Sequence, residues 1–99
     1  MPKLNVTQSL RKLDGSELAG PEGKPLPVRW ALVEALLAPD KDASASTKLD
    51  RFLLATRVQK CDEVELTTEE ASACKECLYR TYPSPLVPGQ IDMMLEGKL

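Results

Sequence analysis

The residues from Pro27 to Leu37 form the longest apolar-rich helical pattern in the sequence. Proline suits the first helical position because its missing N–H would have no acceptor there. A second proline, Pro39, ends the pattern because it disfavours helical geometry at Ala38. Only Arg29 and Glu34 are charged within the stretch. A helix that is apolar over most of its surface must be covered by other elements, so the sequence predicts a central helix wrapped by the rest of the chain.

Two apolar stripes run along this predicted helix. The first consists of Val28, Ala31, Leu32, Ala35 and Leu36, and the second of Trp30, Val33 and Leu37. Spacings of three and four residues put the members of a stripe on one helical face. Because aromatic residues make up only 4% of the chain, leucine, valine and alanine have to supply most of the core.

The length and charge of the chain limit what it can be. Its 99 residues allow one domain with a single core and are too few for two. A net charge of −2 argues against nonspecific binding to nucleic acid or anionic membranes, which needs a basic face. No stretch approaches the ~20 apolar residues of a membrane span, and the first residues lack the apolar segment of a secretory signal. We therefore expect a cytoplasmic protein without membrane contact.

A second helix is predicted from about Lys48 to Lys60, with Ser46 or Thr47 as its N-cap. Leu49, Phe52, Leu53 and Thr56 lie on one side, which Leu54 and Val58 extend, while Lys48, Arg51, Arg57 and Lys60 occupy the remainder. Such a basic face is typical of solvated surface, and contact with an acidic partner is the alternative.

Two shorter helices are predicted in the last third of the chain. Thr67 is followed three positions later by Glu70, a capping box that starts a helix running to about Thr81. A final helix is predicted from Pro88 to Glu96, since proline is favourable at a helix start and Gly97 at its end.

The segment from Lys3 to Leu18 has the pattern of a small β-hairpin or extended arm, with Asp14-Gly15 as its turn. The run from Gly20 to Pro25 is expected to be a loop. The predicted fold is therefore α+β and predominantly helical, with an N-terminal hairpin before a compact bundle of about four helices. Residues 1–25 form the arm and loop and residues 26–97 the helical body of one domain.

The cysteines allow three interpretations: a metal site, a redox pair, or buried core residues. Structural zinc needs four ligands, and with no histidine in the chain Asp62 or Glu63 would have to join Cys61, Cys74 and Cys77. A redox CxxC pair is typical of a helix N-terminus, whereas Cys74 and Cys77 fall inside a predicted helix. We interpret them as small buried hydrophobic residues and expect no metal and no cofactor.

No set of residues suited to catalysis is present. The sequence has no histidine, no glycine-rich phosphate loop and no nucleophile elbow. The protein is therefore not expected to be an enzyme.

Five segments together form a recognisable layout. They are Leu13-Asp14-Gly15, Ala35-Leu36-Leu37, the helix from Lys48 to Val58, Val64-Glu65-Leu66-Thr67, and Pro85-Leu86-Val87-Pro88-Gly89-Gln90. The chain resembles in these segments a group of short tailed-phage and prophage proteins, from whose pattern Cys74 and Cys77 depart. The resemblance implies a shared fold and a phage-encoded origin in the cytoplasm of a host cell. It implies no activity and no site.

These observations favour a non-enzymatic protein-interaction module that acts in virion assembly or by binding a host protein. Its partner would be another protein, of the phage or the host, or a second copy of the chain. A marginally stable arm is suited to strand addition. The candidate contact residues are Trp30, Arg51, Arg57, Leu86 and Met94.

The alternative function is that of a small nucleic-acid-binding regulator that uses the basic face of the second helix. Its basic residues, Arg51 and Arg57 among them, would contact phosphates. The helix after it opens with Glu69 and Glu70, which would face phosphate rather than read bases, so nucleic acid is the less favoured partner.

Overall fold

The structure is a computed structural model that describes residues 2–20 and 23–97. These residues form four helices, a two-stranded sheet and the segments that connect them. In chain order the elements are β1 (Lys3–Asn5), α1 (Val28–Leu37), α2 (Ala45–Lys60), β2 (Glu63–Glu65), α3 (Thr68–Thr81) and α4 (Leu86–Leu95). The expected class, α+β and mostly helical with four helices, is confirmed. None of these helices is long and apolar enough to cross a membrane.

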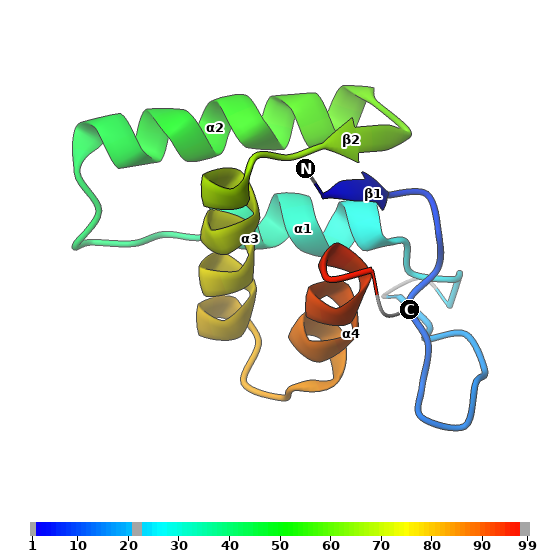
Figure 1. Ribbon diagram of the computed structural model, residues 1–99. Coiled ribbons are helices and arrows are strands. Elements are labelled where there is room, and N and C mark those ends of the chain that lie inside the picture. The colour runs from blue at the N-terminus through cyan, green and yellow to red at the C-terminus, as the bar shows by residue number, and fades with distance from the viewer. Residues whose placement is uncertain (1, 21–22, 98–99) are drawn as a thin grey trace.

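The helix α1 occupies the centre of the molecule. Figure 1 shows α2 running along it on one side, with α3 and α4 crossing beneath on the other. All five members of its first predicted stripe are buried, whereas Trp30 and Leu37 of the second remain substantially exposed. Pro27 precedes the helix in extended geometry as its N-cap, one position before the expected place. The predicted role of this helix as the core element is therefore confirmed.

The strand β1 does not pair with the segment that follows it in sequence. Its partner is β2, from the connection between α2 and α3, and the antiparallel pair sets Leu4 opposite Val64. Both side chains are buried while their neighbours are exposed, so the pairing directs one face of each strand into the core. A pairing across about 60 residues leaves no local pattern in the sequence, which is why the expected hairpin partner was wrong.

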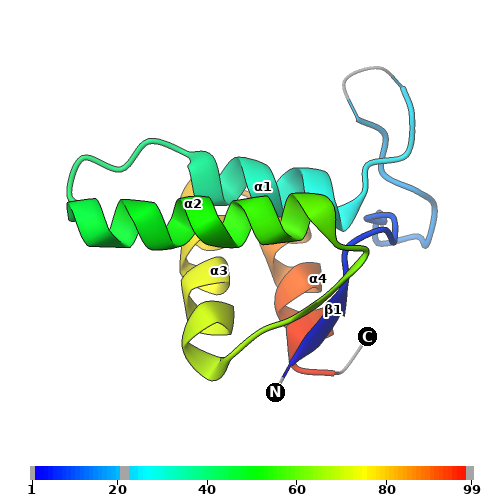
Figure 2. The same ribbon diagram turned by 90° about the horizontal axis from the view of Figure 1, so that it is seen from above.

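Residues 8–20 and 23–28 belong to a loop that projects beside the helices (Figure 2) and is closed at its base, where Val28 N–H donates to Gln8 O at 2.9 Å. From here on we call these residues the arm. Three leucines close it: Leu10 N–H donates to Leu26 O at 2.8 Å, Leu26 N–H to Leu18 O at 2.9 Å, and Leu18 N–H to Leu10 O at 2.9 Å. The predicted turn at Asp14-Gly15 is present, and Gly15 has a φ of +91°, which glycine adopts without steric cost. Within the expected loop at residues 20–25, positions 21 and 22 lie outside the described residues.

The capping box of α3 forms as predicted. Glu70 N–H donates to Thr67 Oγ1 at 3.0 Å, and Thr67 N–H donates to Glu70 Oε1 at 2.9 Å. Two helix N–H groups that lack intrahelical acceptors are thereby satisfied.

The starts of α2 and α4 differ from expectation. Ser44, and neither Ser46 nor Thr47, caps α2, because its hydroxyl accepts from Thr47 N–H at 3.2 Å and the helix begins at Ala45. The helix α4 begins two residues early, at Leu86. Pro88 then lies in its first turn, where a missing N–H leaves no helical hydrogen bond unmade.

Candidate protein-interaction surfaces

The outward side of α2 exposes three large apolar side chains. Leu49, Phe52 and Leu53 are 56%, 57% and 56% exposed, whereas Leu54, Ala55 and Val58 on the opposite side are buried. The sequence predicts one apolar side that Leu54 and Val58 extend, but in the fold these two are buried and the other large apolar side chains are not. The helix α1 is the main element packed against α2. We call the surface formed by Leu49, Phe52, Leu53 and Thr56 the outer face of α2.

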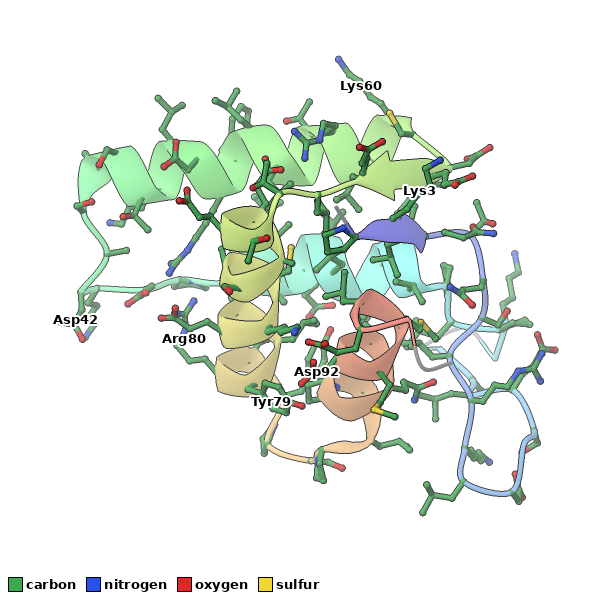
Figure 3. The ribbon with its side chains drawn as sticks, viewed as in Figure 1. Lys3, Asp42, Lys60, Tyr79, Arg80 and Asp92 are labelled. Carbon is green, nitrogen blue, oxygen red and sulfur yellow. The ribbon has the colours of Figure 1, made fainter. Side chains whose placement is uncertain are left out.

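A lysine stands at each end of this outer face. Lys48 precedes Leu49 and Lys60 ends the helix, and Figure 3 shows Lys60 projecting away from the body of the protein. Neither ammonium group forms an ion pair with any residue in the described ranges. The outer face is thus apolar along its length and positively charged at both ends.

Arg51, a predicted contact residue, is engaged within the fold. Its Nη1 lies 3.0 Å from Asp40 Oδ2, and Arg80 Nη1 reaches the same oxygen at 2.9 Å. The hydrogen bond from Arg51 is the main reason that the pKa of Asp40 lies below its usual value. Asp40 thereby fastens the connection between α1 and α2 to both α2 and α3, and Arg51 is mostly buried beneath it.

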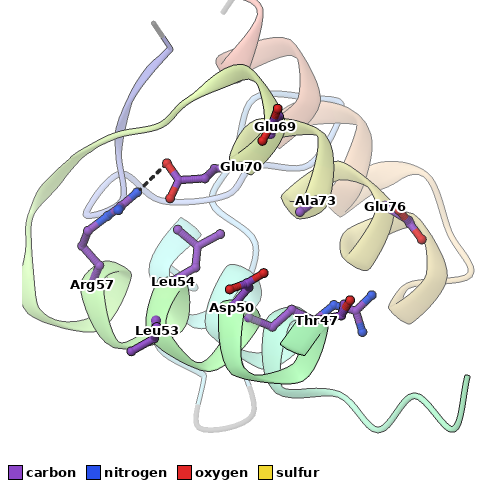
Figure 4. Close-up of a pocket in the computed structure, with 10 residues that line it drawn as sticks. Thr47, Asp50, Leu53, Leu54, Arg57, Glu69, Glu70, Ala73 and Glu76 are labelled. Carbon is purple, nitrogen blue, oxygen red and sulfur yellow. Dashed lines mark hydrogen bonds and ion pairs between the residues drawn. The ribbon is translucent and has the colours of Figure 1, made fainter. Parts of the chain in front are cut away.

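Arg57, also a predicted contact residue, joins α2 to the start of α3. Its Nη2 lies 2.9 Å from Glu70 Oε1, the contact drawn as a dashed line in Figure 4, and 3.3 Å from Glu65 O. This hydrogen bond, with the one from Thr67 N–H, lowers the pKa of Glu70. Glu70 therefore serves both the capping box and an ion pair between helices.

The cleft between α2 and α3, about 430 Å³ in volume, is lined by both arginines but also by several acidic side chains (Figure 4). The acidic side chains are Asp50, Glu69, Glu70 and Glu76. With four carboxylates beside two arginines that already form ion pairs, the cleft would repel a phosphate backbone. Nothing in this geometry favours the nucleic-acid alternative.

Leu86 and Met94 lie together in a second, larger depression. It has a volume of about 940 Å³ and runs between the arm and α4, and we call it the arm groove. Its lining consists of Gln8, Ser9, Arg11, Lys12, Leu13 and Gly15 from the arm and Ser84, Pro85, Leu86, Gly89, Gln90, Met93 and Met94 from α4 and the residues before it. Trp30, the remaining predicted contact residue, is 41% exposed at the start of α1 and is not part of this lining.

Gln90 connects the two walls of the arm groove. Its Oε1 accepts from Arg11 N–H at 2.9 Å and its Nε2 donates to Arg11 O at 3.0 Å. Nε2 also donates to Leu86 O at 2.8 Å, which fixes the side chain on α4. Sequence reasoning missed Gln90 because a contact between residues 79 positions apart has no local signal.

The helices α3 and α4, which support this groove, are also joined by polar contacts. Tyr79 Oη donates to Asp92 Oδ2 at 2.7 Å, and Figure 3 shows these two side chains reaching toward each other between the helices. The hydrogen bond to Asp92 is the main cause that raises the pKa of Tyr79.

Cys74 and Cys77 are placed as the core interpretation predicts, whereas for Cys61 that interpretation is wrong. Cys74 and Cys77 are fully buried on the inner side of α3, Cys61 is exposed, and the described residues contain no group of side chains arranged to hold a metal ion. Burial raises the pKa of the Cys74 thiol to about 12. At neutral pH this sulfur is a protonated, unreactive thiol.

We expect only one of the three thiols to react with an aromatic disulfide reagent in the native protein. Cys61 should be modified within minutes at pH 8, whereas Cys74 and Cys77 should react only after unfolding in urea, because a protein thiolate has to reach the reagent's disulfide, attack one sulfur and release the other as an aromatic thiolate. The absorbance of the aromatic thiolate released from the reagent gives the number of modified cysteines. Cys61→Ser is the control. Rapid modification of two or three thiols in the folded protein would contradict the structure.

No family model, curated protein or solved structure matches this chain. Its function therefore has to be inferred from its own surfaces.

Proposed function

We propose that this protein is a non-enzymatic protein-interaction module whose outer face of α2 docks against an amphipathic helix with acidic flanks. One observation carries the proposal: three large apolar side chains, each more than half exposed, lie together on one face of a 16-residue helix. Contiguous exposed apolar patches with polar rims are typical of interaction sites. An amphipathic helix is the partner that presents matching apolar rows at helical spacing.

The charges around the outer face support an acidic partner. Lys48 and Lys60 stand at its two ends, and no described carboxylate neutralises either of them. Acidic residues flanking the apolar row of a partner would meet these ammonium groups at the rim. Such charges chiefly raise the association rate and discriminate between partners.

A second copy of the chain is a poorer occupant of this face. A 16-residue helix is about 24 Å long and roughly 10 Å wide, so two such faces bury on the order of 250 Å² each. A stable dimer needs about 800 Å² per partner. An antiparallel arrangement would also bring Lys48 of one copy toward Lys60 of the other. The contact is therefore of the small, transient class and is made with a different protein.

A phage or prophage origin, which rests on the resemblance of the five segments, belongs to the same proposal. A virion-assembly factor would present this face to another phage protein, whereas a host-directed factor would present it to one host protein. The requirement for an acidic amphipathic helix is the same in both cases.

The proposal is tested with a synthetic helical peptide and the ¹⁵N-labelled protein. The peptide carries leucines at positions i, i+3, i+4 and i+7 with glutamates beside them, and a second peptide has lysine in place of every glutamate. We expect the acidic peptide to shift the amide resonances of residues 45–60 in two-dimensional NMR spectra. Leu53→Ser should weaken the Kd at least tenfold, which corresponds to about 1.4 kcal/mol.

Leu37→Ser is the matched control, since Leu37 is also an exposed leucine, at 55%, but lies on α1. It should change the Kd less than twofold. Equal binding of the lysine peptide, or an unchanged Kd for Leu53→Ser, would reject the proposal. A dimer in light scattering that Leu53→Ser abolishes would show that a second copy occupies the face instead.

A further inference from the structure

We infer that the arm groove binds an extended acidic peptide of another protein by strand addition to residues 9–12. This site is separate from the outer face of α2 and does not depend on it. Three properties of the groove support the inference: a short backbone edge to which no strand is paired, an apolar floor, and a lining that carries only positive charge.

The backbone edge follows from the hydrogen bonds of the arm. Leu10 and Lys12 direct their backbone groups into the arm. Lys12 N–H donates to Ser16 O at 2.8 Å, Leu10 N–H donates to Leu26 O, and Leu10 O accepts from Leu18 N–H. Successive residues of an extended segment direct their backbone groups to opposite sides, so Ser9 and Arg11 direct theirs toward the groove, before the chain enters the turn that Gly15 N–H closes on Lys12 O. The N–H and C=O groups of Ser9 have no partner among the described residues. An edge of this kind is a template for pairing with another chain.

Gln90 shows how the edge is used. Its side-chain amide gives Arg11 both hydrogen bonds that one residue of a neighbouring strand would give, a donor to the C=O and an acceptor for the N–H. One residue position of an added strand is thus held by an amide from α4. A peptide that pairs at Ser9 and at Arg11 displaces this amide and leaves Gln90 its bond to Leu86 O.

The floor of the groove is suited to the side chains of such a peptide. Leu86, Met93 and Met94 line it, with Pro85 at one end. Alternate side chains of an extended peptide project to one side, so every second residue would lie on this floor. Methionine adapts to side chains of different shape because it is unbranched and flexible. The volume of about 940 Å³ accommodates several apolar side chains.

The charge of the lining selects an acidic peptide. Arg11 and Lys12 line the groove together with no aspartate or glutamate, although the whole chain carries a net charge of −2. Neither cation forms an ion pair within the described ranges, and the guanidinium of Arg11 donates to Gly15 O at 2.9 Å. Carboxylates on the peptide residues that do not lie on the floor would complement them.

The experiment uses an eight-residue peptide of alternating valine and glutamate and the full-length ¹⁵N-labelled protein. A second peptide has the same sequence with N-methyl groups on alternate backbone amides, which removes the donors needed for pairing and keeps the side chains. We expect the first peptide to shift the amide resonances of Ser9 and Arg11 and to slow the hydrogen exchange of Ser9 N–H. The N-methylated peptide should bind at least tenfold more weakly.

Two charge reversals complete the test. Lys12→Glu should weaken the Kd at least fivefold, because Lys12 lines the groove, whereas Lys24→Glu reverses the same charge on an exposed arm residue outside the lining and should change the Kd less than twofold. The inference is overturned if the N-methylated peptide binds as tightly as the first. It is equally overturned if both reversals have the same effect, or if the shifts fall on Met93 and Met94 and spare Ser9 and Arg11.

Discussion

Leu32→Ala is expected to lower the free energy of unfolding by about 2–5 kcal/mol, the range measured when a buried leucine is truncated. Leu32 is fully buried in α1, the helix that contacts both α2 and α3. The surrounding helices are held by their own ion pairs and caps, so they cannot move in to fill the space that the side chain leaves. Unfolding in urea, followed by circular dichroism and by the fluorescence of Trp30, measures the loss.

Leu37→Ala is the control for this prediction. It makes the same chemical change in the same helix at a position that is 55% exposed. The free energy of unfolding should therefore change by less than about 1 kcal/mol. Equal losses at positions 32 and 37 would show that α1 is not the centre of the core. The thermal midpoint should differ between the two variants by more than about 8 °C.

The central helix was predictable because its signal is local. The stripe of Val28, Leu32 and Leu36 is read from spacing alone, and the prolines on either side mark the limits of α1. The capping box of Thr67 and Glu70 was predictable for the same reason, since both residues lie within one helical turn. Features of this kind depend on neighbours a few residues apart.

The outer face of α2 was not predictable because it depends on how many elements surround the helix. The sequence shows one broad apolar side, and a helix in the middle of a bundle would bury all of it. In the fold α1 is the main element packed against α2, with lesser contact from β2, and Leu54 and Val58 are buried while Leu49, Phe52 and Leu53 are exposed. Burial here is a property of the tertiary arrangement.

The arm groove was predictable only in part. Leu86 and Met94 were predicted as contact residues because large apolar side chains are common in interfaces. Gln90, Arg11 and Lys12 also line the groove, but no local sequence pattern distinguishes them. Their role comes from the hydrogen bonds that bring α4 against residues 9–13, and likewise β1 finds its partner in β2 only through the completed fold. Contacts between distant segments are what the sequence pattern could not supply.

Leu10→Ala is expected to lower the free energy of unfolding by about 2–5 kcal/mol. Leu10 belongs to the arm, yet its side chain is fully buried and packs in the same core cluster as Leu4, Val6 and Leu32. The arm is therefore a part of the core that also closes on itself through Leu18 and Leu26. Urea unfolding with the signal of Trp30 is the measurement.

Leu13→Ala, three residues further along, is the matched control. Leu13 is 98% exposed at the tip of the arm, so its truncation should leave the free energy of unfolding within about 0.5 kcal/mol. If Leu10→Ala costs no more than Leu13→Ala, the arm is a detachable segment and not part of the core. The arm groove would then lack a fixed wall, and residues 9–12 could not offer an ordered edge to a peptide. A large difference between the two variants supports the rigid edge that strand addition requires.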